Sequence, residues 1–228
     1  MRITAEKKEE TRRNIVQAAS DLFLSKGFKN TTTRDIANLA KIATGTLFNY
    51  YPTKESIVLE MALFAQERAA QSFPQRLRGG EALDEQLFAH IASGIRELAP
   101  IRSYLSEVFD TAMSPFVSGQ TLPQAEELRN SHLAIVDRLI DESRPSLTPQ
   151  RRNLLLHLYW TLYLGVIAFW TRDESYHQEQ TLALLDQSMK LFANAVVSEI
   201  LPTSSLSQPL DHDGIPSNES ATKSNFRE

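Results

Sequence analysis

The chain has 228 residues, 42% of them hydrophobic, which is enough to bury the core of one ordinary domain and a smaller one. It contains no cysteine, which excludes disulfides, thiolate metal sites and a cysteine nucleophile, and agrees with a reducing cytosol. The N-terminal stretch "MRITAEKKEETRRNIVQ" has no apolar run like that of a signal peptide, so we expect a cytoplasmic protein.

The charge is distributed unevenly along the chain. Residues 1–55 hold 10 of the 24 Lys and Arg but only 6 of the 28 Asp and Glu, a net charge of +4, and the remainder carries −8. A basic N-terminal module on an acidic body suggests a polyanion as partner of the first part alone. Charge by itself fits a solvated surface equally well.

Apolar residues at helical spacing predict a first helix that ends at Gly27, where a C-terminal glycine belongs: Ile15, Ala19, Leu22 and Phe23. A second, short helix follows in "TTTRDIANLA". Thr32 is its expected N-cap, with Asp35 three residues on as in a capping box. Its expected inward residues are Ile36, Leu39 and Ala40.

A third helix is expected in "KIATGTLFNYYPTK", from about Thr44 to near Tyr51, because Pro52 disfavours helical geometry in the residue before it. Two short helices joined by a tight turn allow one to lie on a phosphate backbone while the next enters the major groove. Leu47 would anchor this helix, whereas Asn49 would project outward, where an asparagine can bond an adenine edge.

The joint spacing of four short motifs resembles the DNA-binding domain of TetR-family transcriptional regulators, over about residues 10–58: "TTRDIA" at 32–37, "GTLF" at 45–48, "YY" at 50–51 and "KE" at 54–55. The resemblance implies that Thr33 and Arg34 contact bases or backbone and that Thr46 and Asn49 read bases. It also implies that Tyr50 and Lys54 bind phosphates and that Tyr51 is core. The full predicted DNA-binding set is Thr33, Arg34, Thr44, Gly45, Thr46, Phe48, Asn49, Tyr50 and Lys54.

Three residues depart from the family pattern. Lys41 stands where a glycine is usual and Ala43 where a Ser or Thr cap is usual, so we expect a slightly strained turn unless Thr44 caps one position later. Phe48 replaces a common tyrosine and loses a hydroxyl that would hold a phosphate.

The rest of the chain predicts an all-α body, with helices at about 54–73, 82–98, 101–113, 123–143, 149–171 and 176–200. We therefore expect a helix-turn-helix DNA-binding domain at 1–55 and a helical ligand-binding and dimerisation domain at 56–201. Residues 202–228, rich in Ser, Pro, Asn and Asp, predict a disordered tail.

The most apolar segment is residues 154–170, flanked by arginines but about three residues short of the roughly 20 needed to span a membrane. A buried helix fits it better than a membrane helix. The family resemblance implies that the last two helices pair across a two-fold axis, with burial inside one chain as the alternative. The expected interface residues are Leu158 and Gly165 on the helix at 149–171 and Leu185, Met189 and Phe192 on the final helix. The predicted apolar stripe of the final helix also includes Leu182 and Val196.

The sequence gives little support for a catalytic function. Glu174 and His177 form one Glu-x-x-His motif, whereas a di-iron bundle needs two, and the five histidines show no metal-ligand spacing. We expect no enzyme activity, cofactor or metal.

Aromatic and polar residues of the body could instead line a ligand cavity: Phe64, Tyr104, Phe109, Met113, Phe116, His132, Trp160 and Tyr163. Packing is the commoner role of each residue taken alone, and it is the family resemblance that implies that several of them line a cavity. Such a lining favours a hydrophobic or amphipathic ligand. By resemblance, the function is a homodimeric repressor that binds a palindromic operator in double-stranded DNA and is released by a small-molecule effector. The alternative is a helical ligand-binding or membrane-associated interaction protein without sequence-specific DNA binding.

Overall fold

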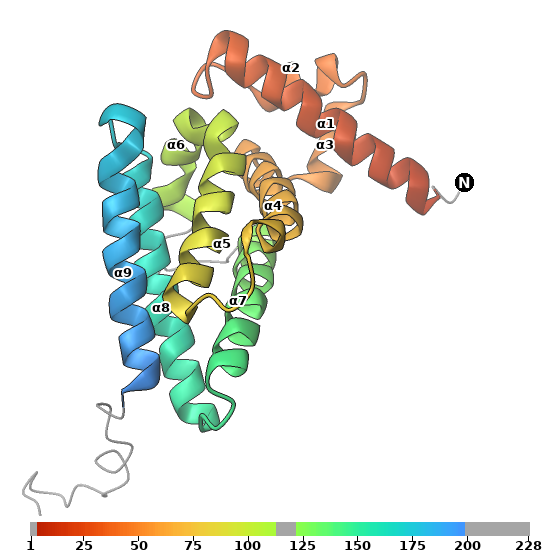
Figure 1. Cartoon of the computed structure of the whole chain (residues 1–228). Helices are drawn as coiled ribbons and strands as arrows, with labels where there is room; N and C mark the ends of the chain where they lie inside the picture. The colour runs from red at the N-terminus through yellow and green to blue at the C-terminus, as the bar shows by residue number, and fades with distance from the viewer. Residues whose placement is uncertain (1–3, 113–121, 199–228) are drawn as a thin grey trace, which may run out of the picture. The chain divides into compact units, whose positions relative to one another are not determined.

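The computed structural model describes residues 4–112 and 122–198, with side chains in the first range described as far as Val108. These residues form only helices and turns, which confirms the all-α prediction (Figure 1). The elements are α1 (Ala5–Lys26), α2 (Thr33–Leu39), α3 (Thr44–Tyr50), α4 (Lys54–Ser72), η1 (Pro74–Arg76), α5 (Leu83–Leu98), η2 (Ala99–Ile101), α6 (Arg102–Ala112), α7 (Pro123–Ser143), α8 (Pro149–Trp170), η3 (Tyr176–Gln178) and α9 (Glu179–Val197).

The end of the first helix and the start of the second lie where their predicted capping residues place them. Gly27 ends α1 with a φ of 82°, and its N–H donates to the carbonyl of Phe23 at 3.0 Å. The Thr32 hydroxyl accepts from the N–H of Asp35 at 3.1 Å, while the Asp35 carboxylate accepts from the N–H of Thr32 at 3.0 Å. The predicted capping box is therefore confirmed.

The inward face of α2 differs from the prediction at one position. Ile36 and Ala37 are fully buried, but Leu39 is 49% exposed. The prediction for Leu39 was wrong because α2 has fewer than two turns, and its last residue lies past the surface that packs on α1 and α3.

Helix α4 is the centre of the fold. It packs against α5, α6 and α7 as well as α1, and every residue from Ser56 to Leu63 is buried. Thr53 caps its first turn by accepting from the N–H of Ser56 at 3.2 Å. Because only three residues separate the end of α3 from the start of α4, α3 is tied closely to the central helix of the body (Figure 1).

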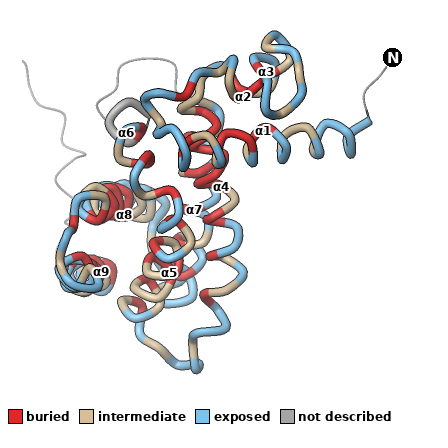
Figure 2. The backbone as a smooth tube through the Cα atoms, turned by 90° about the horizontal axis from the view of Figure 1, so that it is seen from above, coloured by how far each residue is buried: buried red, intermediate tan, exposed pale blue. Residues whose placement is uncertain are grey.

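The body is completed by α5 to α9. Helix α5 packs against α4, α7 and α9, and α8 packs against α7 and α9. The buried residues gather on the mutually facing sides of α4, α5, α8 and α9 (Figure 2). Helix α8 is long and apolar enough to cross a membrane by length and composition alone, with 44% of its most apolar window buried inside the chain.

The last helix begins later than predicted. Residues 176–178 form a separate 3-10 turn in which His177 and Gln178 have positive φ, and α9 starts at Glu179. Asp173 fixes this start because its carboxylate accepts from the N–H and the hydroxyl of Thr181, at 2.9 and 2.6 Å. Thr181 is consequently buried, and the predicted stripe residue Leu182 is instead 40% exposed.

The helical segments 54–73, 82–98, 123–143 and 149–171 agree with the observed helices to within one residue at each end. The predicted tail at 202–228 lies outside the described residues, as do Met113 and Phe116. The domain limits at 55 and 201 stay predictions.

Candidate DNA interface and buried cavity

The turn between α2 and α3 adopts the strained geometry that the sequence predicts. Lys41 has a φ of 56°, and its N–H donates to the carbonyl of Asn38 at 3.2 Å. A side chain with a Cβ in this left-handed region costs about 1 kcal/mol relative to glycine. Ala43 is the N-cap of α3 and offers no side-chain acceptor, so the alternative of a cap at Thr44 is wrong.

Helix α3 has one anchored face. Leu47 is fully buried and Tyr51, directly after the helix, is 1% exposed, which confirms its predicted place in the core. Burial raises the pKa of Tyr51 to about 12. These two side chains anchor the helix in the core, where it packs on α2, while Phe48 and Asn49 on the opposite face stay exposed.

The outward face of α3 carries most of the predicted DNA-binding residues. Gly45, Phe48 and Asn49 are exposed, and Thr44, Thr46 and Tyr50 are half-buried. Phe48 is 47% exposed, a large apolar side chain left at the surface of a helix of seven residues. A Cβ at Gly45 would meet nothing within 4 Å, so another backbone can approach this position closely.

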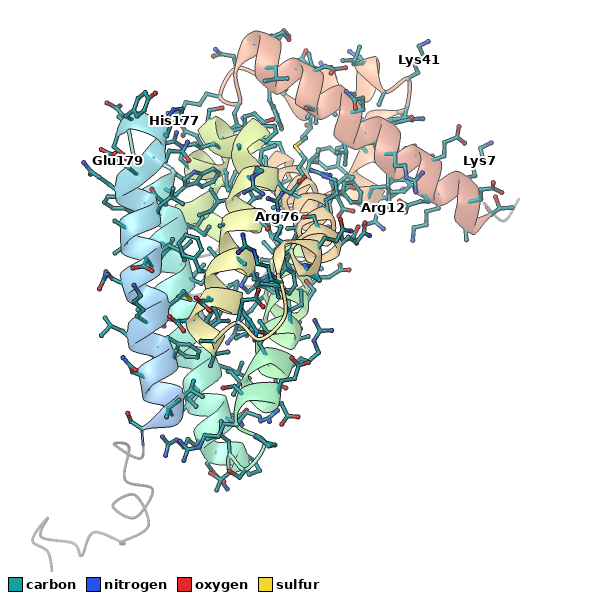
Figure 3. The ribbon with its side chains drawn as sticks, in the orientation of Figure 1. Lys7, Arg12, Lys41, Arg76, His177 and Glu179 are labelled. Carbon is teal, nitrogen blue, oxygen red and sulfur yellow. The ribbon has the colours of Figure 1, made fainter. Side chains whose placement is uncertain are left out.

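Helix α2 and the turn add further polar groups to this surface. Arg34 is exposed and Thr33 is half-buried. The pKa of Asp35 is lowered because its carboxylate accepts hydrogen bonds from Thr32 and lies 3.4 Å from the Lys26 ammonium. Lys41 projects from the turn, away from the helices of the body (Figure 3).

Lys54 makes contacts within the chain, and its predicted phosphate contact stays a prediction. Its ammonium donates to the carbonyls of Phe28 at 2.7 Å and Thr31 at 3.3 Å, with a longer contact to Lys29, and it lies 4.2 Å from the centre of the Phe28 ring. These bonds engage the donors of the ammonium in closing the loop between α1 and α2. Sequence spacing could not reveal this, because the three carbonyls are brought to Lys54 only by the fold.

The body contains a small cavity of about 20 Å³ bounded by α4, α5, α6, α7 and α8. Its lining residues are Ala62, Gln66, Ala69, His90, Ile91, Gly94, Leu98, Leu105, Leu128, His132, Tyr163 and Ile167. Of the predicted ligand-binding residues, His132 and Tyr163 line it. Its volume is about that of one water molecule, so a larger ligand requires the helices to separate.

The remaining predicted lining residues lie elsewhere. Tyr104 packs on Phe23 with 5.3 Å between ring centres, and Phe64 lines a charged surface hollow with Arg12 and Glu60. Trp160 contacts the rings of His132 and Tyr163 from outside the cavity lining. The side chains of Phe109 and Met113 are outside the described residues.

Two cavity residues that the sequence analysis missed, Gln66 and His90, are polar side chains buried in the core. The rings of His90 and His132 lie 4.7 Å apart, and His132 Nε2 is 2.9 Å from the Tyr159 hydroxyl. Burial lowers the pKa of His90 to about 4 and that of His132 well below its ordinary value, so both are neutral near pH 7. The sequence feature that could have identified His90 is its position on the apolar stripe of α5, beside Leu87 and Ile91.

The predicted dimer interface is only partly available for contact. Leu158 and Gly165 are exposed on α8, but Leu185, Met189 and Phe192 are fully buried within the chain, where α9 packs against α5 and α8. Placing these three in an interface between chains was therefore wrong. The exposed large apolar residues of the last two helices are Leu154, Leu158, Phe169, Leu182, Leu184, Leu191 and Val197.

Within residues 4–112 and 122–198 no group of three or more His, Asp or Glu side chains could hold a metal ion. Glu174 and His177 are both exposed, next to the turn before α9.

Comparison with known proteins assigns both halves of the chain. Residues 15–61 match the family model for bacterial regulatory proteins of the tetR family. Residues 86–207, more than half of the chain, match the model for the tetracyclin repressor-like C-terminal domain.

Individual relatives agree with this assignment. The HTH-type transcriptional regulator UidR of Escherichia coli K12 is 27% identical over 137 residues, which cover 60% of this chain and 66% of UidR. A TetR transcriptional regulator from Rhodococcus sp. RHA1 has a TM-score of 0.62 at 17% identity, covering 81% of this chain and 97% of that one. FadR from Thermus thermophilus, a TetR-family repressor solved with lauroyl-CoA, has a TM-score of 0.60 at 22% identity, covering 84% and 97%.

One long and two short helices, the third facing outward, precede an all-helical body, and with the two family matches they define a helix-turn-helix DNA-binding regulator. The chain belongs to the TetR family of bacterial transcriptional regulators. The family predicted from the motifs at 32–55 is thereby confirmed.

Proposed function

We propose that the protein is a repressor that binds a palindromic operator as a homodimer in the cytoplasm and releases it when a hydrophobic or amphipathic ligand binds. The observation that carries the proposal is the outward face of α3, where Thr46, Phe48 and Asn49 stand away from a buried anchor. A short helix held this way fits the major groove.

We assign the contacts by chemistry. Asn49 can pair with an adenine edge, and the exposed Phe48 ring can pack on a thymine methyl group. Thr46 at the start of the same face is the second base-reading residue. Thr33, Arg34, Thr44 and Tyr50, together with the backbone at Gly45, suit contacts to phosphates, which fix register without reading sequence.

The dimer proposal rests on the exposed apolar face of the last two helices. On α8, Leu154, Leu158, Gly165 and Phe169 recur at helical spacing on one side. Leu184 and Leu191 on α9 are two helical turns apart and also exposed. A two-fold pair of such faces would bury this stripe and present two copies of α3 to successive half-sites.

The effector proposal rests on the cavity at the centre of the body. Most of its lining is apolar, and α4, which contributes Gln66 to it, runs directly from the end of α3. A ligand that binds better when the two α3 helices are wrongly spaced weakens DNA binding by that difference in affinity. Lauroyl-CoA, found in the Thermus FadR, is a reasonable first compound to test.

Selection of bound sequences from a random duplex pool by the purified full chain tests the proposal. We expect a palindromic consensus with half-sites about one turn of DNA apart, and binding that weakens steeply with salt. Recovery of no sequence above background at low salt would instead favour a ligand-binding or interaction protein whose basic helices contact another partner.

A further inference from the structure

The histidine at the centre of the cavity has no hydrogen-bond partner. His90 is 2% exposed, and among the described residues neither of its ring nitrogens is paired. Buried polar groups in proteins are almost always hydrogen-bonded, so an exception of this kind calls for a specific explanation. His90 also lines the cavity, which gives its ring direct access to whatever occupies that space.

The surroundings of His90 limit what it can bind. Its ring packs on Phe73 on one side and on His132 on another, with ring centres 5.0 and 4.7 Å away. Among the described residues the cavity lining contains no Lys, Arg, Asp or Glu, and its other polar groups are Gln66, His132 and Tyr163. Arg138 acts electrostatically on His90 from outside this lining. An ionised ligand group would therefore enter an apolar space with no charged side chain of the described lining against it, at a high desolvation cost.

Two of these other polar groups, Gln66 and His132, are already hydrogen-bonded to other residues. Gln66 donates its side-chain amide to Ser131 Oγ at 2.7 Å and to the Leu128 carbonyl at 3.3 Å. His132 shares a hydrogen bond with the Tyr159 hydroxyl. His90 can offer a new ligand both an N–H donor and a ring-nitrogen acceptor that no described residue engages, since a neutral imidazole has one of each.

We propose that His90 recognises an uncharged hydrogen-bonding group, a hydroxyl or a carbonyl, on a mostly apolar ligand bound in this cavity. In the resting protein the cavity has room for one water molecule, which such a group would replace. The rest of the ligand would lie among Leu98, Leu105 and Ile167 after the helices separate. This inference deepens the effector proposal above and rests on it for the ligand's regulatory role, but not for binding itself.

Calorimetry on the full chain without DNA tests the site, with three probes of one shape: 4-ethylphenol, ethylbenzene and 4-ethylbenzoate. The wild type should bind 4-ethylphenol about tenfold or more tightly than ethylbenzene, because loss of a hydrogen bond inside a buried site is costly. It should bind the ionised 4-ethylbenzoate more weakly than either. His90→Leu should abolish the preference for the phenol and keep ethylbenzene binding, whereas His177→Asn, at an exposed histidine, should change neither.

A measurement on the wild type guards against a variant that does not fold. Binding of 4-ethylphenol should shift the ring ¹⁵N signals of His90, assigned with His90→Gln, while ethylbenzene at saturation should leave them near their free values. The inference is overturned if no probe binds, if the phenol binds without moving these signals, or if His90→Leu keeps the wild-type preference.

Operator binding distinguishes a failure of the repressor proposal from a failure of the proposed ligand site. In a separate gel-shift experiment with the selected operator, release of DNA by 4-ethylphenol would support both ideas. Absence of operator binding, together with the His90-dependent preference in calorimetry, would refute the repressor proposal and leave the ligand site standing.

Discussion

At the scale of single residues, α3 separates anchoring from recognition. Leu47 and Tyr51 are buried, so replacing them would damage the fold, whereas Asn49 is exposed and makes no contact that the fold needs. Asn49→Ala should therefore leave thermal stability unchanged and weaken binding to the best operator by about 1 to 3 kcal/mol. The preference should relax at one base pair per half-site.

Competition binding with operator and random duplexes measures this effect. An equal loss on both kinds of DNA would contradict base reading by Asn49. Asn153→Ala, at an exposed asparagine on α8, is the matched control and should change neither affinity.

Lys54 should act on stability more than on DNA. Its ammonium bonds to carbonyls at the end of α1, and hydrogen bonds from charged groups contribute about 1.5 to 3 kcal/mol. Lys54→Met should lower the free energy of unfolding by about 1 to 2 kcal/mol, because the side chain is partly exposed, and leave the salt dependence of DNA binding unchanged. Denaturant unfolding measures the loss of stability, and a salt titration of DNA binding tests whether Lys54 contacts a phosphate. Loss of a phosphate contact would reduce the slope of log K against log salt by about 1.

His90 and His132 should make the protein sensitive to mild acid. The pKa of His90 is about 4 in the folded chain and that of His132 is also low, against about 6.5 when unfolded. Between these limits the unfolded chain binds protons that the folded chain does not, so stability falls as pH falls. From pH 7 to 5 His90 should contribute a loss of about 2 kcal/mol, and His132 should contribute a loss of the same sign.

Urea unfolding of the wild type and of His90→Leu at pH 7 and pH 5 measures this loss. The variant should lose about 2 kcal/mol less than the wild type over the same interval. An equal loss in both proteins would mean that His90 titrates alike in the folded and unfolded states.

At the scale of helices, the sequence predicts the ends better than the faces. Caps and breakers act locally, so Gly27, Thr32 and Pro149 could place the ends of helices from the sequence alone. Faces depend on tertiary packing. Helices α8 and α9 are apolar on more than one side, and periodicity could not decide that Leu185, Met189 and Phe192 pack within the chain while Leu184 and Leu191 face outward.

The same limit applies to the candidate sites. The surface that we propose to bind DNA could be recognised from the sequence because its motifs all lie within residues 32–55, on two helices and the turn between them. The cavity brings together residues from five helices, and His90 joins it through the packing of α5 on α4 and α7. No local pattern specifies that arrangement.

The exposed face of α8 should hold the dimer together. In a two-fold interface a substitution occurs twice, and burying an unpaired charge there costs at least about 2 kcal/mol per copy. Leu158→Glu should therefore raise the dimer Kd about 1,000-fold and produce monomers at micromolar concentration. Sedimentation analysis would show the change, with Leu24→Glu, at a leucine that is 70% exposed on α1, as a control that stays dimeric.

At the scale of the whole chain, the DNA-binding helices are held to the body by specific polar and aromatic contacts. Arg12 on α1 pairs with Glu60 on α4, a carboxylate that is 1% exposed, and Lys29 pairs with Glu107 on α6 at 3.0 Å. Phe23 packs on Tyr104 of α6. Burial raises the pKa of Glu60 and Arg12 opposes that shift, so the ion pair keeps a buried charge at the junction of α1 and α4.

Removal of one partner should therefore cost more than removal of both. Arg12→Met leaves the Glu60 carboxylate buried without its countercharge, which costs about 3 to 5 kcal/mol for a fully buried pair, and we expect about 3 because the Arg12 side chain is 35% exposed. Arg12→Met combined with Glu60→Gln should regain most of this loss. Arg13→Met, at a side chain that is 73% exposed, should change stability by about 0.5 kcal/mol or less.

Urea unfolding of the wild type, Arg12→Met, Glu60→Gln and the double variant measures the coupling free energy between the two side chains. If the losses of unfolding free energy in the single variants simply add up in the double variant, the pair does not stabilise the junction. Operator affinity measured on the same proteins extends the test to function. If α4 transmits ligand binding to α3, the double variant, folded but without this polar link, should bind the operator with altered affinity, whereas Arg13→Met should shift only the salt-dependent part of binding.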